Sequence, residues 1–186
     1  MGTSIIAGPA ITRVLQQKQK RRLSDLLSDK QFVPHLASIS VQGVIGELAQ
    51  SAEEITGITA ETVYEAVWER EQVLHTGLGD ALAVPHARFS DEQLKKPIII
   101  VGISEDGIDF DAPDGRPAHI ICMLLTPESD PTSQLELLDM VARAFRSAEA
   151  RTGAMRAGTY TEFIAAINLA DAESEIQDQE NAESEG

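Results

Sequence analysis

The stretch HTGLGDALAVPHARF, His75–Phe89, decides how this chain is interpreted. It contains two glycines one residue apart, a short run of small apolar residues, and then a proline followed by a histidine. Proline has no backbone N–H and fixes its own φ, so a strand's hydrogen-bond ladder is expected to end at Pro85. His86 is thereby predicted to lie where a strand leaves the sheet, the region in which open α/β sheets usually bind ligands.

Four helices are predicted around this stretch from caps followed by apolar residues at helical spacing. Ser40 and Thr59 can cap the first two helices, which Gly57 separates. Asp130, followed by proline at the first helical position, opens the third, and Thr159 begins a capping box before the fourth. The apolar stripe of the third helix is predicted to consist of Leu135, Leu138, Val141, Ala142 and Phe145.

Strand signals lie between the second and third helices. Continuous apolar runs rich in β-branched residues predict strands that are buried on both faces of a sheet. These runs are ALAV, PIIIVGIS and HIICMLLTP, at residues 81–84, 97–104 and 119–127. Residues 111–118, DAPDGRPA, have the composition of a turn. The sequence therefore predicts the α/β class, with helices around a small, mostly buried sheet.

Composition and charge limit the domain count, the ligands and the compartment. The 186 residues suffice for one domain with a proper core and are too few for two comfortable ones. A net charge of −15 disfavours nucleic acid as a partner, because its binding depends on cationic contacts to phosphate. A single cysteine, Cys122, excludes an internal disulfide framework and suits a reducing compartment. The chain is expected to be cytoplasmic.

The two ends differ in charge from the body. Residues 1–22 begin apolar and end in KQKRR, with five basic residues and no acidic one. Within them GTSIIAGP, Gly2–Pro9, resembles the last membrane helix of bacterial monovalent cation/proton antiporters. The segment is therefore either the stub of a membrane helix or a basic leader. Residues 171–186 carry seven acids and no base, which predicts a disordered acidic tail, and residues 23–170 are predicted to form the domain.

His86 is the candidate catalytic residue because a positioned imidazole can carry a phosphoryl group. With a reference pKa of ~6.5, histidine is mostly neutral at pH 7 and has a nucleophilic ring nitrogen. The protein need only hold the tautomer and balance the incoming negative charge. The N–H groups of Gly77 and Gly79 can approach such an anion closely, and Arg70 and Arg88 can supply positive charge.

Other chemistry has little support in the sequence. No cofactor is predicted, since Gly-Leu-Gly lacks the later glycine and lysine of a nucleotide-binding loop. No metal site is predicted, because a set made of His75, Asp80 and His86 has nothing further to support it. His35 and His119 have no partners at ligand spacing and are interpreted as structural.

The run from Trp68 to Arg88, WEREQVLHTGLGDALAVPHAR, resembles the active-site signature of the enzyme IIA domains of the bacterial phosphotransferase system. The similarity is to the fructose/mannitol and nitrogen-regulatory branch. That pattern has Arg-Glu ahead of the histidine, then Thr-Gly-hydrophobic-Gly, then Ala-hydrophobic-Pro-His. Residues 108–127, IDFDAPDGRPAHIICMLLTP, resemble the strand–turn–strand segment of the family. The resemblance implies a mixed sheet flanked by helices.

The resemblance also implies a phosphohistidine carrier or regulator. Family members accept phosphate on the histidine of Pro-His, here His86, from a histidine-phosphorylated carrier protein, and the arginine of Arg-Glu, here Arg70, would help to bind it. They pass the phosphate to a sugar permease domain or use it as a regulatory mark. A second histidine is usual where this chain has Gln134, which can donate a hydrogen bond but cannot become cationic. His75 stands where family members usually have a small residue, and it is a candidate to take over part of the role of the missing second histidine.

Two other functions remain open. The same pocket can serve a cytoplasmic sensory domain of a cation/proton antiporter that binds a small anion or nucleotide without covalent chemistry. An attached or neighbouring membrane transporter would then be the partner, and the domain would be tethered to the inner face of the membrane. A scaffold without activity is the third interpretation, favoured by Gln134 and weakened by the intact Pro-His pair.

Overall fold

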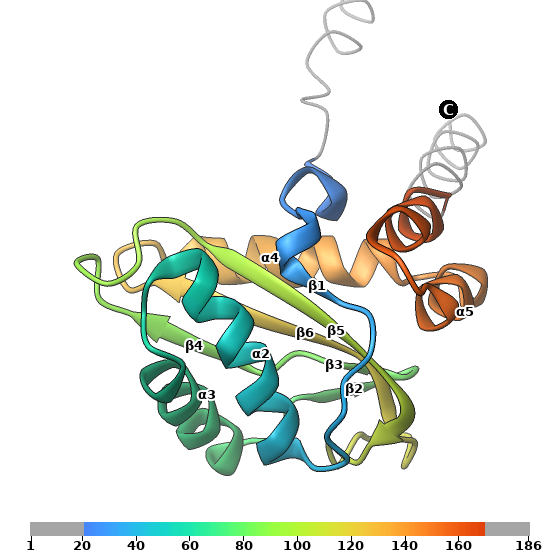
Figure 1. Cartoon of the computed structure of the whole chain (residues 1–186), viewed down its shortest axis with the longest axis horizontal. Coiled ribbons are helices and arrows are strands. Elements are labelled where there is room, and N and C mark those ends of the chain that lie inside the picture. Colours follow the sequence, from blue (N-terminus) through green and yellow to red (C-terminus); the bar gives the residue numbers. More distant parts are fainter. Residues whose placement is uncertain (1–20, 170–186) are drawn as a thin grey trace, which may run out of the picture.

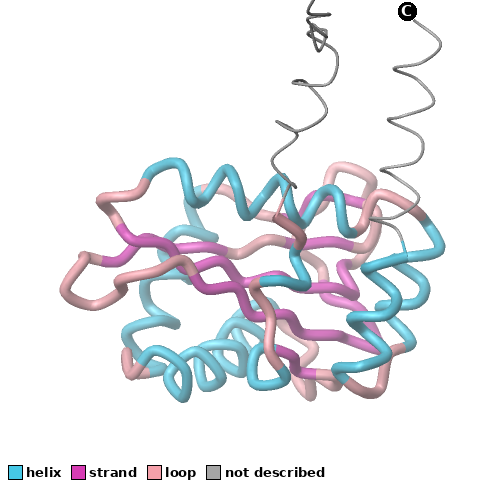
Figure 2. The backbone as a smooth tube through the Cα atoms, turned by 90° about the horizontal axis from the view of Figure 1, so that it is seen from above, coloured by secondary structure: helices cyan, strands magenta, loops and turns pink. Residues whose placement is uncertain are grey.

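A computed structural model describes residues 21–169, in which a six-stranded mixed sheet lies between two layers of helices (Figures 1 and 2). The predicted α/β class, with a mixed sheet flanked by helices, is confirmed. Nearly all of the basic segment 1–22 and the whole of the acidic segment 171–186 lie outside the described residues. No helix within residues 21–169 has the length and apolar character needed to cross a membrane.

The sheet is built on two long antiparallel strands. The strands are β1 (Phe32–Val33), β2 (Gly77–Gly79), β3 (Leu82–Ala83), β4 (His86–Phe89), β5 (Ile98–Ile108) and β6 (Ala118–Pro127). β5 pairs antiparallel with β6 at the centre, β1 pairs parallel with β5, and β2 pairs antiparallel with β3. β3 and β4 both pair parallel with β6. Most residues of β5 and β6 are buried, because helices cover both faces.

β3 and β4 are two pieces of one interrupted strand. Leu82 pairs with Ile120 and His86 with Leu124, so both pieces keep the same register along β6. Between them the Pro85 carbonyl accepts a hydrogen bond from the N–H of Leu124 at 2.9 Å. The predicted end of the ladder at Pro85 is therefore wrong, because proline removes a donor but keeps its acceptor. His86 is the first residue of a resumed strand.

Two helices cover one face of the sheet, α2 (Val41–Thr56) and α3 (Ala60–Val73). Both begin at the predicted caps. The side chain of Ser40 accepts from the N–H of Gly43 at 3.1 Å, and that of Thr59 accepts from Thr62 at 3.3 Å. α2 ends at Gly57, whose φ of +75° is the left-handed conformation that glycine adopts at low cost.

The other face is covered by α4 (Pro131–Ala144), α5 (Ala148–Arg156) and the helical residues 160–169. Two short 3₁₀ turns, η1 (Leu23–Asp25) and η2 (Asp29–Gln31), precede β1. Asp130 caps α4 as predicted by accepting from the N–H of Ser133, with proline at the first helical position. In the core of this face Phe163 stacks on Phe32, with ring centroids 4.5 Å apart.

The apolar stripe predicted for α4 is correct for Val141, Phe145 and the partly buried Leu138, and wrong for Leu135 and Ala142. Leu135 is 68% exposed and Ala142 is exposed as well. Besides Val141, the helix buries Leu137, Met140 and Ala144, which were not predicted. Both sets of residues recur at helical spacing, so periodicity alone does not choose between them; packing against β6 does.

Candidate functional site

The ring of His86 is oriented by the chain just before it. Its Nδ1 lies 2.9 Å from the carbonyl oxygen of Val84. A carbonyl only accepts, so Nδ1 carries the hydrogen in the neutral ring and Nε2 carries the free electron pair. The N–H of Val84 in turn donates to the carbonyl of Thr76 at 3.0 Å, which holds Val84 in place. Nε2 is therefore the ring nitrogen of His86 that is able to act as a nucleophile.

The surroundings of His86 favour the neutral ring. The side chain is partly buried but still reached by solvent. Burial is the largest effect and lowers the pKa of the imidazole below its usual 6.5, and the charges of Arg70 and Arg88 lower it further. The hydrogen bond to Val84 and the charge of Glu71 raise the pKa and offset part of this. At pH 7 the ring is therefore neutral and able to act as a nucleophile.

Both predicted arginines, Arg70 and Arg88, are close enough to His86 for their charges to lower its pKa. Arg70 comes from α3, and its Nη1 is buried without a hydrogen-bond partner among residues 21–169. A buried donor without a partner costs free energy, and an incoming anion would relieve that cost. Arg88 lies two residues after His86 on β4, so both side chains lie on the same side of the strand.

Gln134 joins the site through Arg88. It lies in the first turn of α4, and its Oε1 accepts from Nε of Arg88 at 3.2 Å. The packing of α4 on β6 brings the two residues together although they are far apart in the sequence. Gln134 thus orients the guanidinium group while remaining neutral.

The predicted glycines lie in β2 and have structural explanations of their own. A Cβ at Gly77 would stand 2.7 Å from the carbonyl oxygen of Phe110. Gly79 has a φ of +88°, and its nearest neighbour is the carboxylate of Asp114. Both positions require glycine for backbone reasons, and their role as an anion cradle stays a prediction.

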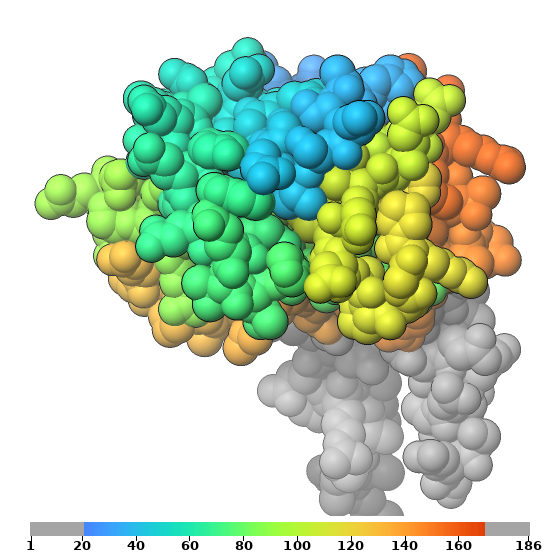
Figure 3. All heavy atoms as spheres, turned by 90° about the horizontal axis from the view of Figure 1, so that it is seen from below, coloured from blue at the N-terminus to red at the C-terminus, as the bar shows by residue number. Residues whose placement is uncertain are grey.

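His75 lies in an acidic neighbourhood. Its Nδ1 lies 3.7 Å from Glu71 and its Nε2 lies 3.9 Å from Asp111. These residues line a cavity of about 480 Å³ together with Trp68 and Asp109. Figure 3 shows the α3–β2 segment, in green, directly beside the turn that follows β5, in yellow. The replacement of a second imidazole by His75 stays a prediction.

Sequence reasoning missed the positioning role of Glu71. Its side chain is 2% exposed, and its carboxylate accepts from the N–H of Thr76 at 2.9 Å and from the hydroxyl at 2.6 Å. The carbonyl of Thr76 holds Val84, and the carbonyl of Val84 holds the ring of His86. The Arg-Glu pair in the quoted motif was the available signal, although nothing in it indicates that the acid is buried.

Comparison with known proteins agrees with this geometry. The family model described as "Phosphoenolpyruvate-dependent sugar phosphotransferase system, EIIA 2" matches residues 25–170. The chain belongs to this family. The enzyme IIA domain is 33% identical over 131 residues to a nitrogen regulatory protein of Pseudomonas aeruginosa, an alignment that covers 70% of this chain and 84% of that protein. It is thus a phosphoryl carrier or regulatory domain of the enzyme IIA type, and the resemblance seen in the sequence is confirmed.

Other relatives define the branch and the fold. The enzyme IIA domain is 28% identical over 151 residues to the fructose-specific EIIABC component of Bacillus subtilis, but it spans only 24% of that protein. The crystal structure of the nitrogen regulatory protein IIA-Ntr from Neisseria meningitidis superimposes with a TM-score of 0.70 at 27% identity, covering 77% of this chain and 97% of that one. Mannitol IIA from Escherichia coli, at 14% identity, covers 76% of this chain and 98% of its own, and shares the fold with a TM-score of 0.64.

Proposed function

We propose that this enzyme IIA domain accepts a phosphoryl group on Nε2 of His86 from a histidine-phosphorylated carrier protein. The observation that carries the proposal is a neutral imidazole, oriented through Nδ1 by Val84, beside the unpaired buried donor of Arg70. In the transfer, the bond from phosphorus to the donor's ring nitrogen breaks as the bond to Nε2 forms. The donor histidine leaves with the electron pair of the broken bond.

The charges near His86 support this step. A phosphoryl group brings a charge of about −1.5 to −2 at pH 7. Arg70 and Arg88 supply two positive charges, and Nη1 of Arg70 would gain the acceptor that it lacks. Since phosphoryl transfer depends mainly on positioning and electrostatics, neither a metal ion nor an acid pair is needed from the protein.

The relatives support a regulatory role for the phosphorylated domain. Those named nitrogen regulatory protein align over most of their own length, as in Pseudomonas aeruginosa at 84%. The mannitol enzyme IIA of Escherichia coli has been solved in complex with phosphorylated enzyme IIB. We infer that a protein partner responds to, or receives, the phosphate on His86. The antiporter alternative depends on Gly2–Pro9, which lies outside the described residues.

Phosphorylation of the purified chain tests the proposal. The protein is incubated with the general phosphocarrier, its kinase and phosphoenolpyruvate, and its intact mass is followed. We expect one acid-labile phosphoryl group, which peptide mapping assigns to His86. If a known enzyme IIA protein in the same mixture is labelled and this chain is not, phosphoryl acceptance is the wrong function.

Arg70→Gln is expected to slow phosphorylation roughly ten- to a hundredfold, because a charge-assisted hydrogen bond contributes about 1.5–3 kcal/mol. The same change should raise the pKa of His86, since Arg70 lowers it in the native protein. The rate is measured by mass spectrometry and the pKa by NMR titration of the ring. Arg156→Gln, an exposed arginine at the end of α5, is the matched control and should alter neither. An unchanged rate for Arg70→Gln would remove Arg70 from the site.

Phosphorylation of His86 should persist below pH 6.5. Only the neutral ring is nucleophilic, and burial together with Arg70 and Arg88 lowers its pKa below 6.5. The rate should therefore fall as the pH passes down through this lowered pKa, at a lower pH than for an unperturbed histidine. Because the donor's histidine also titrates, NMR titration of His86 supplies an independent value. A midpoint above 6.5 in that titration would contradict the assignment.

A further inference from the structure

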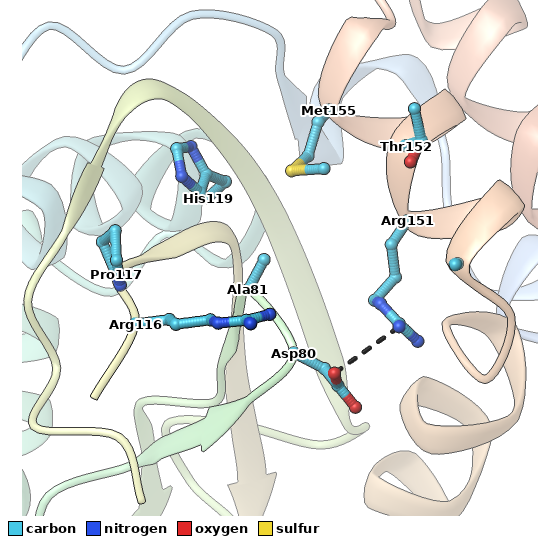
Figure 4. A pocket seen from close by; sticks show the side chains of 9 residues that line it. Asp80, Ala81, Arg116, Pro117, His119, Arg151, Thr152 and Met155 are labelled. Carbon is cyan, nitrogen blue, oxygen red and sulfur yellow. Dashed lines mark ion pairs between the residues drawn. The ribbon is translucent and has the colours of Figure 1, made fainter. Parts of the chain in front are cut away.

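A cavity of about 330 Å³ lies beside the start of β6 (Figure 4). Its walls are the tip of the β2–β3 hairpin, the turn before β6, and α5. The volume is at the lower end of the range of roughly 300–1,000 Å³ that is usual for small-molecule pockets. We call it the hairpin-tip pocket, and the proposed function makes no use of it.

Two arginines point into the hairpin-tip pocket. Arg151 projects from α5, and its Nη1 donates to the carbonyls of Phe145 and Arg146 at 2.9 Å each, so the guanidinium group is held in place. Its Nη2 lies 3.5 Å from a carboxylate oxygen of Asp80. Arg116 extends from the turn before β6 toward the same region (Figure 4). Among the residues that line the pocket, two guanidinium groups face one carboxylate, that of Asp80. The carboxylate of Asp114 lies outside this lining, near Arg116.

The two walls of the pocket are tied together by Asp114. Its carboxylate accepts from the N–H of Asp80 at 2.9 Å and from the N–H of Arg116 at 3.1 Å. Asp80 and Ala81 both have positive φ, +52° and +67°, which residues other than glycine adopt only when their surroundings hold them there. The carbonyl of Ala81 accepts from the N–H of His119 at 2.8 Å. The pocket is therefore formed in the absence of a ligand, which reduces the cost of ordering on binding.

The remaining wall is largely apolar. Pro117 and Met155 face the cavity from opposite sides (Figure 4). The ring of His119 also lines it, and its Nδ1 is engaged with the carbonyl of Ser104 at 2.9 Å. A ligand that fits this pocket therefore combines one anionic group with a compact apolar body.

We propose that the hairpin-tip pocket binds a small organic anion, a carboxylate or a phosphate monoester, whose charged group lies between Arg116 and Arg151. Asp80 occupies that position weakly, since its side chain is 69% exposed and its contact with Arg151 is long. Exposed ion pairs contribute about 0–1 kcal/mol, so an anion can displace Asp80 at little cost. Pro117 and Met155 then contact the apolar body of the ligand.

This pocket is distinct from the phosphorylation site. His119 lies at the start of β6, whereas His86 pairs with Leu124 farther along the same strand. At about 3.3 Å per residue, the five-residue separation is about 16 Å. Binding in the hairpin-tip pocket is therefore expected to be the same in wild type and in His86→Ala, which separates this proposal from the proposed function.

Titration of the ¹⁵N-labelled chain with two probe anions, phenyl phosphate and benzoate, tests the proposal by NMR. We expect saturable amide shifts in residues 79–82, 115–119 and 148–155 with at least one probe, and none with benzyl alcohol, which lacks the charge. The probe that binds more tightly identifies the preferred anionic group. Arg116→Gln should weaken binding roughly tenfold by removing a charge-assisted contact. Arg156→Gln, on the same helix as Arg151 but outside the pocket, should leave it unchanged.

Three results would overturn the proposal. One is the absence of saturable shifts in these segments with either probe. Another is saturation confined to residues around His86. The third is equal affinity in Arg116→Gln and Arg156→Gln. Because Arg116 is exposed, its replacement should preserve the fold, and the spectrum of each variant reports this directly.

Discussion

His86→Ala is expected to abolish phosphoryl acceptance completely while the domain stays folded. The neighbouring groups that shape the site cannot take over, because guanidinium and amide nitrogens are poor nucleophiles, and the carboxylate of Glu71 is engaged by Thr76. The lost contact is a single hydrogen bond to Val84 from a partly buried side chain, worth about 0.5–1.5 kcal/mol. Intact mass after incubation with the phosphocarrier system measures the loss, and circular dichroism checks the fold.

His75→Ala is the matched control for this experiment. His75 is 59% exposed and contacts Glu71 and Asp111 rather than His86. We expect it to be labelled to the full extent. Retention of the acid-labile phosphate in His86→Ala would place the acceptor elsewhere, and loss of label in His75→Ala would show that this second imidazole takes part after all.

Phe163→Ala is expected to lower the free energy of unfolding by about 3–5 kcal/mol, as for other buried phenylalanines. The side chain is fully buried, stacks on Phe32 and lies 6.2 Å from the ring of Phe145. It thereby packs the helical residues 160–169 against the strand at the edge of the sheet and against the end of α4. Since cavities left by aromatic rings close only partly, most of the lost packing is not recovered. Urea denaturation followed by circular dichroism measures the change.

Leu135→Ala, on α4, is the comparison for Phe163→Ala. The side chain is 68% exposed, so its removal should change stability by no more than about 0.5 kcal/mol. Leu137→Ala removes a side chain that is 1% exposed and should lower the free energy of unfolding by about 2–5 kcal/mol. Similar losses for Leu135→Ala and Leu137→Ala would mean that the phase of α4 is different from the one described.

Local features of the structure were predictable from the sequence. Ser40, Thr59 and Asp130 cap helices as expected, because a cap depends only on a side chain and the N–H groups two or three residues later. The apolar runs at 97–104 and 119–127 form the central strands because their length and β-branched residues are those of buried strands. The family was likewise readable from the spacing of Arg-Glu, Thr-Gly and Pro-His.

The features missed or mistaken all depend on contacts between distant segments. Pro85 did not end the ladder because β6 supplies a donor for its carbonyl. Glu71 is one of many acidic residues in the sequence, and only the fold buries it against Thr76. Only the docking of α4 shows that Oε1 of Gln134 accepts from Arg88, and the binding of phosphate by Gln134 stays a prediction.

The sequence by itself thus determined the caps, the strand cores and the family, since each is encoded in a short continuous stretch of residues. The tertiary structure alone decided the phase of α4, the continuity of β3 with β4, the burial of Glu71 and the convergence of Arg116 and Arg151. The physical reason is that these features are set by sheet register and by helix docking, which balance many weak contacts between remote residues. A local sequence pattern therefore does not predict the sheet register or the helix docking.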